Sequence, residues 1–454
     1  MNNRTFLKHC SIFLSILLGA FICPDLRAEA PATPAAQNEN VVLPPTNEPK
    51  PLSLEDCYKL ALETYETVAI QKEAIERAKA LMFTAASEAL PEVDFVITRE
   101  KMENQKEYPG AYASNATGGA FGDPNILQRK FTINQPLFQG LKSVGAITGA
   151  GSIKKEATEN WIRTKELLYR DVALAFHAVL RYQKDLKIIR DVHDLLEERI
   201  KELEEREKIG RSRASEVATA TTGLKSLEAD LAGTKGALAT SQYLLEYFIG
   251  TSIGGRKLED NSPEDLSARA IGEYLKNITN RPDVKSAEQS VKTAWSSILV
   301  AQSGFWPTIN LDHTQYMRRE GSLANVNWDL LFTVNVPLFS GGATIGQVKD
   351  SVSVLKQKKL SYSLIKRQAE LEVKQSYESW RYSHEQFRSL SEAVASAEEN
   401  YKLQSEEYRR SLVNNLDVLS ALQSLNQTRQ NANQAFYQAK NDEARFKVAI
   451  GEDL

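Results

Sequence analysis

Cysteine is scarce in this chain, which limits the ways in which its fold can be held together. The 454 residues contain three cysteines, and two of them, Cys10 and Cys23, lie within the first thirty residues. We predict that residues 1–30 are an export signal, because two basic residues precede an apolar stretch and an Ala-Glu-Ala cleavage site ends at Ala30. Cleavage leaves Cys57 alone, so no intrachain disulfide can form and stability must come from packing or assembly.

The segment after the predicted signal has no apolar periodicity. Residues 31–50 are rich in Pro, Ala and Asn, which is typical of an extended linker. Lipid attachment at Cys23 is the alternative to plain cleavage. Phe21 and Ile22 argue against it, because a small residue normally precedes a lipidated cysteine.

Long apolar runs are also missing after the signal. No stretch of about eighteen apolar residues follows residue 30, which excludes a helical membrane span, although an exported protein can still enter an outer membrane as a β-barrel. The formal net charge is −3, and the sequence has no cluster of basic residues of the kind that binds nucleic acid. The sequence has no phosphate loop and no G-x-S-x-G or H-E-x-x-H motif. We therefore predict that the protein is not an enzyme and has no cofactor and no metal site.

What the chain does contain is a long internal repeat. The phrase FTINQPLFQG at 131–140 returns as FTVNVPLFSG at 332–341, 201 positions later. The same offset places Gly250 on Gly451, and an offset of 216 aligns the segments upstream of these phrases. Similarity at such long range predicts two copies of one structural unit. The predicted repeats are residues 51–250 and 267–454, and the linker between them is 251–266.

Each repeat reads as helix, two strands, long helix, turn and helix. The last predicted strand alternates apolar and polar residues, which suits a barrel wall with lipid outside and water inside. A half-buried sheet of a soluble protein is the alternative. Four strands cannot close a barrel, so the chain must oligomerise or leave open edges in lipid. The predicted strands are about 92–101, 127–138, 308–319 and 326–338, and the predicted hairpin helices are about 141–209, 215–249, 341–410 and 415–450.

The predicted helix at about 341–410 contains no proline and carries a regular stripe. Trp380, Phe387, Val394, Tyr401 and Tyr408 recur at seven-residue spacing. This spacing is typical of a helix that packs along another helix. The stripe therefore predicts that the long helices have helical neighbours.

Each long helix is predicted to end in a turn far from the strands. Ser215 and Asn415 are predicted N-caps of the returning helices, and Glu216 and Asp417 follow in the first turn, where the helix dipole favours acids. Helix capping alone explains both acids. In a symmetric oligomer, however, each acid would also become a ring.

Several phrases of the sequence, in this order and partly duplicated, carry a resemblance to a known family. They are LSLEDCYKLALETYE, the pair ALPEV and FWPTI, the pair QPLFQG and VPLFSG, and YRRSLVNNLDVLSALQSLNQTR. With them, residues 50 to 454 resemble the outer membrane channel-tunnel family of TolC-type efflux and secretion proteins. The resemblance implies a mainly α fold with a membrane β part. In this fold a homotrimer joins four strands per chain into a twelve-stranded β-barrel, which continues into a long α-helical barrel in the periplasm.

The resemblance also implies a function and partners. The protein would be a passive outer membrane exit duct of a tripartite efflux or type I secretion system, served by a periplasmic adaptor protein and an inner-membrane pump. A non-pore periplasmic coiled-coil adaptor or scaffold is the alternative. No feature of the sequence selects a substrate or a pump class.

The resemblance assigns roles to three groups of residues. Asp417 matches an aspartate that can form a threefold carboxylate ring at the tunnel entrance in this family. Glu216 is the acid that aligns with it in the first turn, and the two are the expected pore constriction. At the joints, proline is expected to end strand pairing and glycine to permit an unusual backbone angle. Ser411 stands where the family usually has glycine. The expected adaptor contacts are Gly210, Arg211, Arg213, Ser215, Ser411 and Asn414, and the expected strand-to-helix joints are Pro136, Gly140, Pro337 and Gly341.

Overall fold

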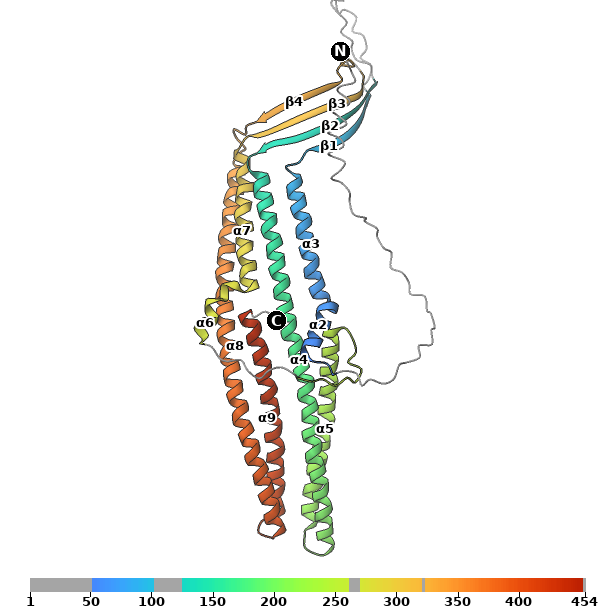
Figure 1. The fold of residues 1–454 in the computed structure, drawn as a ribbon, viewed down its shortest axis with the longest axis vertical. Helices are drawn as coiled ribbons and strands as arrows, with labels where there is room; N and C mark the ends of the chain where they lie inside the picture. The colour runs from blue at the N-terminus through green and yellow to red at the C-terminus, as the bar shows by residue number, and fades with distance from the viewer. Residues whose placement is uncertain (1–50, 102–124, 261–269, 321–322, 452–454) are drawn as a thin grey trace, which may run out of the picture. The chain divides into compact units, whose positions relative to one another are not determined.

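The chain folds mainly into helices, with one small sheet (Figure 1). The computed structural model describes residues 51–101, 125–260, 270–320 and 323–451, which all belong to the unit Lys50–Leu454. The predicted signal, the predicted 31–50 linker and the last part of the 251–266 linker lie outside the described residues. The helices are α2 (Leu54–Thr64), α3 (Glu66–Ser87), α4 (Lys142–Lys208), α5 (Ala214–Ile249), α6 (Ile271–Lys276), α7 (Pro282–Gln302), α8 (Ala343–Arg409) and α9 (Asn415–Ile450), with 3-10 turns η1 (Ile278–Asn280) and η2 (Ser303–Phe305).

The sheet has four antiparallel strands in the order β1-β2-β3-β4. Within the described chain, β1 and β4 are therefore the outer strands, and each has one edge without a partner strand. β4 is shorter than the predicted strand at 326–338. The strands are β1 (Glu92–Lys101), β2 (Asn125–Gln139), β3 (Thr308–Arg319) and β4 (Trp328–Asn335).

The strand register sorts the side chains into a mainly apolar and a mainly polar face. Phe95 lies opposite Phe131 with ring centroids 4.8 Å apart, and Leu311 lies opposite Phe332. On the other face, the Asn134 amide donates to the Asp312 carboxylate at 2.6 Å. Because alternate residues of a strand point to opposite sides, one face of the sheet is suited to hydrocarbon and the other to water.

One prediction about the strand-to-helix joints is wrong. Pro136 does not end the strand: β2 continues to Gln139, and the register shifts between Pro136 and Phe138 instead. A bulge accommodates a residue that cannot donate a backbone hydrogen bond, so the ladder resumes beyond it. The expectation fits the second joint better, where β4 ends at Asn335, two residues before Pro337.

The two halves of the chain contain matching helical hairpins. Helices α4 and α8 each have 67 residues, and α5 and α9 each have 36. α4 packs on α5 and α8 packs on α9, while α4 also contacts α7 and α9. Figure 1 shows the four strands at one end of the long helices and the two hairpin turns at the other. None of the helices in the described ranges combines the length and the hydropathy needed to cross a membrane.

The predicted stripe is the packed side of α8, which confirms that interpretation. Trp380 and Tyr408 are buried, and the three residues of the stripe between them are half-buried, whereas most of their neighbours on the helix are exposed. Trp380 stacks on Phe446 of α9, with ring centroids 5.4 Å apart. Long aromatic side chains at this spacing fill the seam between two helices.

Helices α2, α4 and α5 enclose the only cysteine that the predicted mature chain retains. Cys57 is fully buried in a cluster that includes Phe176 of α4 and Leu245 of α5. Burial, with a smaller effect of Asp56, raises the pKa of its thiol to about 11. Cys57 is therefore a protonated packing residue.

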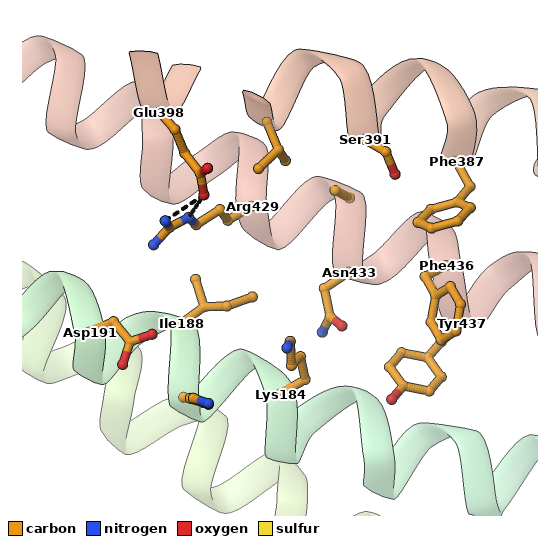
Figure 2. A pocket seen from close by; sticks show the side chains of 13 residues that line it. Lys184, Ile188, Asp191, Phe387, Ser391, Glu398, Arg429, Asn433, Phe436 and Tyr437 are labelled. Atoms are coloured by element: carbon orange, nitrogen blue, oxygen red, sulfur yellow. Dashed lines mark hydrogen bonds and ion pairs between the residues drawn. The ribbon is translucent and has the colours of Figure 1, made fainter. Parts of the chain in front are cut away.

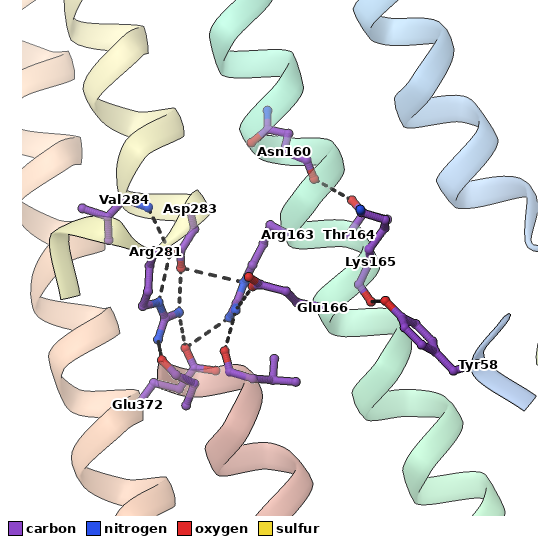
Figure 3. A network of polar contacts seen from close by, with 12 residues as sticks. Tyr58, Asn160, Arg163, Thr164, Lys165, Glu166, Arg281, Asp283, Val284 and Glu372 are labelled. Atoms are coloured by element: carbon purple, nitrogen blue, oxygen red, sulfur yellow. Dashed lines mark hydrogen bonds and ion pairs between the residues drawn. The ribbon is translucent and has the colours of Figure 1, made fainter. Parts of the chain in front are cut away.

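A buried polar network holds the C-terminal end of α9 against α4, α7 and α8 (Figure 3). Arg281, which is 1% exposed, donates to the Ala449 carbonyl at 2.7 Å and to the carboxylates of Asp283 and Glu372. Arg163 donates to the Val448 carbonyl at 3.0 Å. The last carbonyls of a helix lack partners within the helix and carry partial negative charge, so two arginines satisfy them well.

Candidate functional site at the helix tips

The first hairpin turn ends α4 with a glycine in left-handed conformation. Gly210 has a φ of +74°. Its N–H donates to the Glu207 carbonyl at 2.8 Å, and the Arg211 N–H donates to the Arg206 carbonyl at 2.7 Å. These two bonds form a Schellman motif, which satisfies carbonyls that the helix leaves open.

The second hairpin turn repeats this geometry with a serine. Ser411 has a φ of +59°, its N–H donates to the Tyr408 carbonyl at 2.9 Å, and the Leu412 N–H donates to the Glu407 carbonyl at 2.9 Å. A side chain with a Cβ is strained in this conformation, whereas glycine is not. The missing glycine noted in the sequence therefore has a local energetic cost.

Asp417 takes part in a capping box at the start of α9. The Asp417 N–H donates to the Asn414 side-chain oxygen at 3.0 Å, and the Asn414 N–H donates to the Asp417 carboxylate at 3.1 Å. The prediction of Asn415 as the N-cap is therefore wrong by one residue. Asn415 is instead buried, because its side chain is engaged by α4.

The start of α5 has no side-chain cap. Arg213 occupies the N-cap position, and Ser215 is already the second residue of the helix, so its prediction as an N-cap is also wrong. Glu216 accepts a hydrogen bond from the Ser212 hydroxyl at 2.8 Å. Both predicted constriction acids thus hold a turn together within one chain, which leaves their role in an oligomer to be proposed.

The structure brings the predicted adaptor-contact residues together at the two tips. All six of these residues are exposed at the ends of the hairpins. The predicted joints lie at the opposite end of the long helices, so they form no common site with the tips. The exposed tip residues are Gly210, Arg211, Arg213, Ser215, Ser411 and Asn414.

An arginine that the sequence did not single out ties the two tips to each other. Arg199 of α4 donates to the Asn415 side-chain oxygen of α9 at 3.0 Å. Its guanidinium carbon lies 3.8 Å from the centroid of the Tyr408 ring at the end of α8. Glu202 accepts from the same guanidinium at 2.6 Å. On the sequence, Arg199 and Glu202 look like an ordinary i,i+3 ion pair, which explains why no signal pointed to this contact between the hairpins.

Two hollows line the helices above the tips. One of about 510 Å³ lies between α4, α5 and α9 and is lined by leucines together with small or polar residues such as Gly223, Ser420 and Asn426. The other, of about 570 Å³, lies between α4, α8 and α9 (Figure 2). There Arg429 and Glu398 form an ion pair at 2.5 Å. No group of three or more metal-ligating side chains occurs in the described ranges.

Comparison with families and curated proteins gives consistent matches. Residues 276–452 match the family described as outer membrane efflux protein. The cation efflux system protein CusC of Escherichia coli (strain K12) is 23% identical over 241 residues, which are 50% of this chain and 51% of that protein. The toluene efflux pump outer membrane protein TtgC of Pseudomonas putida is 21% identical over 301 residues, or 60% of each protein. The chain thus spans about half the length of the CusC relative that it matches.

Solved structures share the fold. The outer membrane protein VceC from Vibrio cholerae superposes with a TM-score of 0.75 at 18% identity, covering 88% of this chain and 96% of that one. A CusC structure superposes with a TM-score of 0.77 at 17% identity, covering 95% and 100%. Together with the family match, these findings confirm the resemblance to outer membrane efflux proteins of TolC type that the sequence phrases indicated.

Proposed function

From this kinship with the outer membrane efflux proteins, we infer that three copies of the chain form an exit duct in the outer membrane. Each copy contributes four strands to a closed twelve-stranded β-barrel and its hairpins to a helical tunnel in the periplasm. An inner-membrane pump and a periplasmic adaptor deliver the cargo, which then diffuses through the duct to the outside.

The observation that carries this proposal is a two-faced sheet with two open edges. One face is apolar, the other is polar, and both β1 and β4 lack a partner on their outer sides in the described chain. Backbone groups at an open edge cannot be satisfied in hydrocarbon, so a sheet in lipid must close on itself. Four strands are too few for closure, and identical copies supply the rest.

The tips are proposed as the periplasmic entrance of the duct. Threefold assembly turns Asp417 and Glu216 into two rings of carboxylates, and the exposed tip residues meet the adaptor. Arg199 holds the tip of the α4–α5 hairpin against the tip of the α8–α9 hairpin. Opening of the entrance then requires the Arg199 contacts with Asn415 and Tyr408 to separate.

Cargo selection is assigned to the pump. The relatives that match carry the names of a cation efflux protein and a toluene efflux protein, so relatives with one shared fold are named for chemically different cargoes. A water-filled tunnel is not shaped around one ligand, in contrast to the enclosed pockets that bind small molecules. We therefore propose passive conduction without a dedicated substrate site.

Membrane fractionation combined with conductance measurement tests the function. We expect the full-length protein to stay in the outer membrane fraction under salt and alkaline washes, and to form ion-conducting pores in planar bilayers after detergent extraction. Release from the membrane without detergent, together with absence of conductance, would overturn the duct and support a non-pore periplasmic adaptor or scaffold.

A further inference from the structure

Two glycines near the sheet have crowded surroundings in the first half of the chain. A Cβ on Gly140 would lie 2.7 Å from the Cβ of Trp306 and 2.8 Å from the Ser303 carbonyl oxygen. A Cβ on Gly145, in the first turns of α4, would lie 2.9 Å from Val300 of α7. Only glycine permits such an approach, so these positions mark where α4 and its joint pack closely against α7 and the η2 turn that precedes β3.

The corresponding glycines of the second half face open space. Gly341 and Gly346 stand at the positions that match Gly140 and Gly145 at the offset of 201, and Gly341 has the same left-handed backbone, with a φ of +63° against +60°. Nothing in the described chain lies within 4 Å of a Cβ at Gly341 or Gly346. In the second half, the surface at Gly341 and Gly346 that corresponds to the crowded one therefore has no packing partner among the described residues.

The missing partner of this surface is also present in the chain, at the far edge of the sheet. The offset of 216 maps α7 and its joint onto α3 and the residues before β1. On this mapping Trp306 corresponds to Leu90, which is 61% exposed, and Leu299 corresponds to Phe83, which is 79% exposed. α4 packs on α7, but α8 has no comparable packing with α3 among the described residues. The α3 face of one copy can meet the α8 face only in a second copy.

We propose that β4 of one copy pairs with β1 of the next copy in the register that β2 uses with β3, and that Gly341 and Gly346 receive α3 and its joint. The proposal rests on the trimeric duct and specifies the contact that closes it. Thr132 lies opposite Thr314 in the β2–β3 ladder. The two offsets translate this pair into Thr333 opposite Thr98 of the neighbouring copy.

The side-chain faces give an independent check of this register. Val334 would lie opposite Ile97 and Phe332 opposite Arg99, so that the face of β4 with Phe332 and Val334 continues the face of β1 with Phe95 and Ile97. A slip by one residue would place the polar side chains of β1 on the same side of the sheet as the apolar side chains of β4. Such a register is excluded when that side faces hydrocarbon. Slips by two residues keep apolar and polar side chains on their own faces. The choice among these registers therefore depends on the β2–β3 pairing, translated by the two repeat offsets.

Disulfide cross-linking measures the register directly. The full-length protein carries Thr98→Cys and Thr333→Cys in a Cys57→Ala background and is oxidised mildly in outer membranes. Matched controls pair Thr333→Cys with Val96→Cys or with Glu100→Cys, which lie on the same face of β1 but two residues away. A shift by two residues separates the Cα atoms of the two positions by roughly 7–8 Å, which exceeds the reach of a disulfide. We expect a reducible, trimer-sized band for the Thr98–Thr333 pair and loss of most of it in both controls.

The other outcomes separate this inference from the proposed function. Stronger linking of a control pair, or no linking of any pair in a protein that still sediments as a trimer, overturns the register while the duct stands. A protein that sediments as a monomer overturns the duct itself. Single-cysteine versions of each variant show that the band depends on both partners.

A substitution at the helix contact tests the second part of the proposal. Gly346→Leu adds a side chain where one copy has open space, and Gly151→Leu is the control, since nothing lies within 4 Å of a Cβ there either. We expect Gly346→Leu to lose trimer while its helical circular dichroism in detergent is retained, and Gly151→Leu to assemble normally. Normal assembly of Gly346→Leu, or equal loss in both variants, contradicts a contact at Gly346.

Discussion

Ser411 and Gly210 show how one backbone geometry is built from two different residues. Both end a long helix in left-handed conformation with the same pair of hydrogen bonds, but only Ser411 has a Cβ to strain. We predict that Ser411→Gly stabilises its turn by about 1 kcal/mol, and that Gly210→Ser destabilises the other turn by a similar amount. Hydrogen–deuterium exchange at the two turns measures the effect. Slower exchange in Gly210→Ser or faster exchange in Ser411→Gly contradicts it.

Asp417 combines two roles that a pair of substitutions can separate. Asn414→Ala removes the cap and keeps the carboxylate, with an expected cost of about 1 kcal/mol to the start of α9. Asp417→Asn removes the charge and keeps a side-chain oxygen that can accept from the Asn414 N–H. If Asp417 forms a ring at the entrance, we expect Asp417→Asn to weaken block of the pore by added divalent cations in planar bilayers, and Asn414→Ala to leave it unchanged. If divalent cations block the Asp417→Asn pore as strongly as the wild type, Asp417 acts only as a helix cap.

The caps also show what local sequence can predict at the residue scale. Asn414 and Asn415 are equally good N-cap residues by type, and only the tertiary contact of Asn415 with Arg199 separates them. The turn itself was predictable, because polar residues such as Asn414 and Asn415 interrupt a long helical pattern. The exact cap was not, since a residue more than two hundred positions away decides it.

At the scale of elements, Arg199 is the contact through which one hairpin tip holds the other. Replacing it leaves the buried Asn415 oxygen without its donor and removes the stacking on Tyr408, an expected cost of about 2–3 kcal/mol. We predict that Arg199→Ala raises the open probability of the pore in planar bilayers. Arg206→Ala is the matched control, because Arg206 lies over the same ring but does not bind Asn415. Equal effects of both variants would show that the ring contact, and not the bridge to α9, matters.

The network at the end of α9 predicts a pH-dependent stability. Burial acts to raise the pKa of Asp283, but the hydrogen bonds and charge of Arg281 outweigh it and hold this pKa below its usual value. A carboxyl with a lowered pKa stabilises the fold above its usual pKa of about 4 and loses this effect as the pH falls through the lowered value. We therefore predict that Asp283→Asn is about 1.5–3 kcal/mol less stable than the wild type at pH 7, and that the difference disappears in acid.

Thermal unfolding followed by circular dichroism between pH 7 and pH 3 checks this pH dependence. Comparing the two proteins at each pH sets aside the shared carboxyls outside the network. Glu166, whose pKa burial raises, is not among them, because the charge of Asp283 also acts on it. Glu288→Gln is the control on the same helix, since Glu288 forms only an exposed pair with Lys292. A difference between wild type and Asp283→Asn that does not shrink as the pH falls from 7 to 3, or that appears equally for Glu288→Gln, contradicts the assignment.

The elements differ in how closely the sequence predicted them. The helix expected at about 341–410 runs from Ala343 to Arg409, because nothing breaks the helical pattern between Gly342 and Ser411. The strands were harder to delimit: β2 passes through Pro136 by a bulge, whereas β4 stops at Asn335. The two ends of α8 are set by residues next to them in the sequence. Strand ends depend instead on the partner strand, and among the described residues β4 lacks one on its outer side.

At the scale of the whole molecule, the number of strands predicted that copies of the chain assemble. The internal repeat then predicted which residues meet between the copies. A two-faced sheet of four strands implied that copies must combine, but periodicity carries no information on which residues meet across the copies. That information came from comparing crowded Gly140 with open Gly341 in the folded chain. The sequence could align the two glycines, and only the structure could show that one of them lacks its neighbour.

The proposed orientation of the sheet in the membrane leads to a prediction about insertion. Phe332 and Thr333 are neighbours in β4 and point to opposite faces, Phe332 to the apolar face and Thr333 to the polar one. An arginine on the lipid face near the middle of the bilayer costs about 2–4 kcal/mol, whereas the water-filled side tolerates it. We therefore expect Phe332→Arg to lower the amount of folded protein in the outer membrane severalfold and Thr333→Arg to insert normally with reduced cation conductance. Heat-modifiable migration on gels and quantitative blotting of outer membranes measure both, and the opposite ranking of the two variants would place lipid on the other face of the sheet.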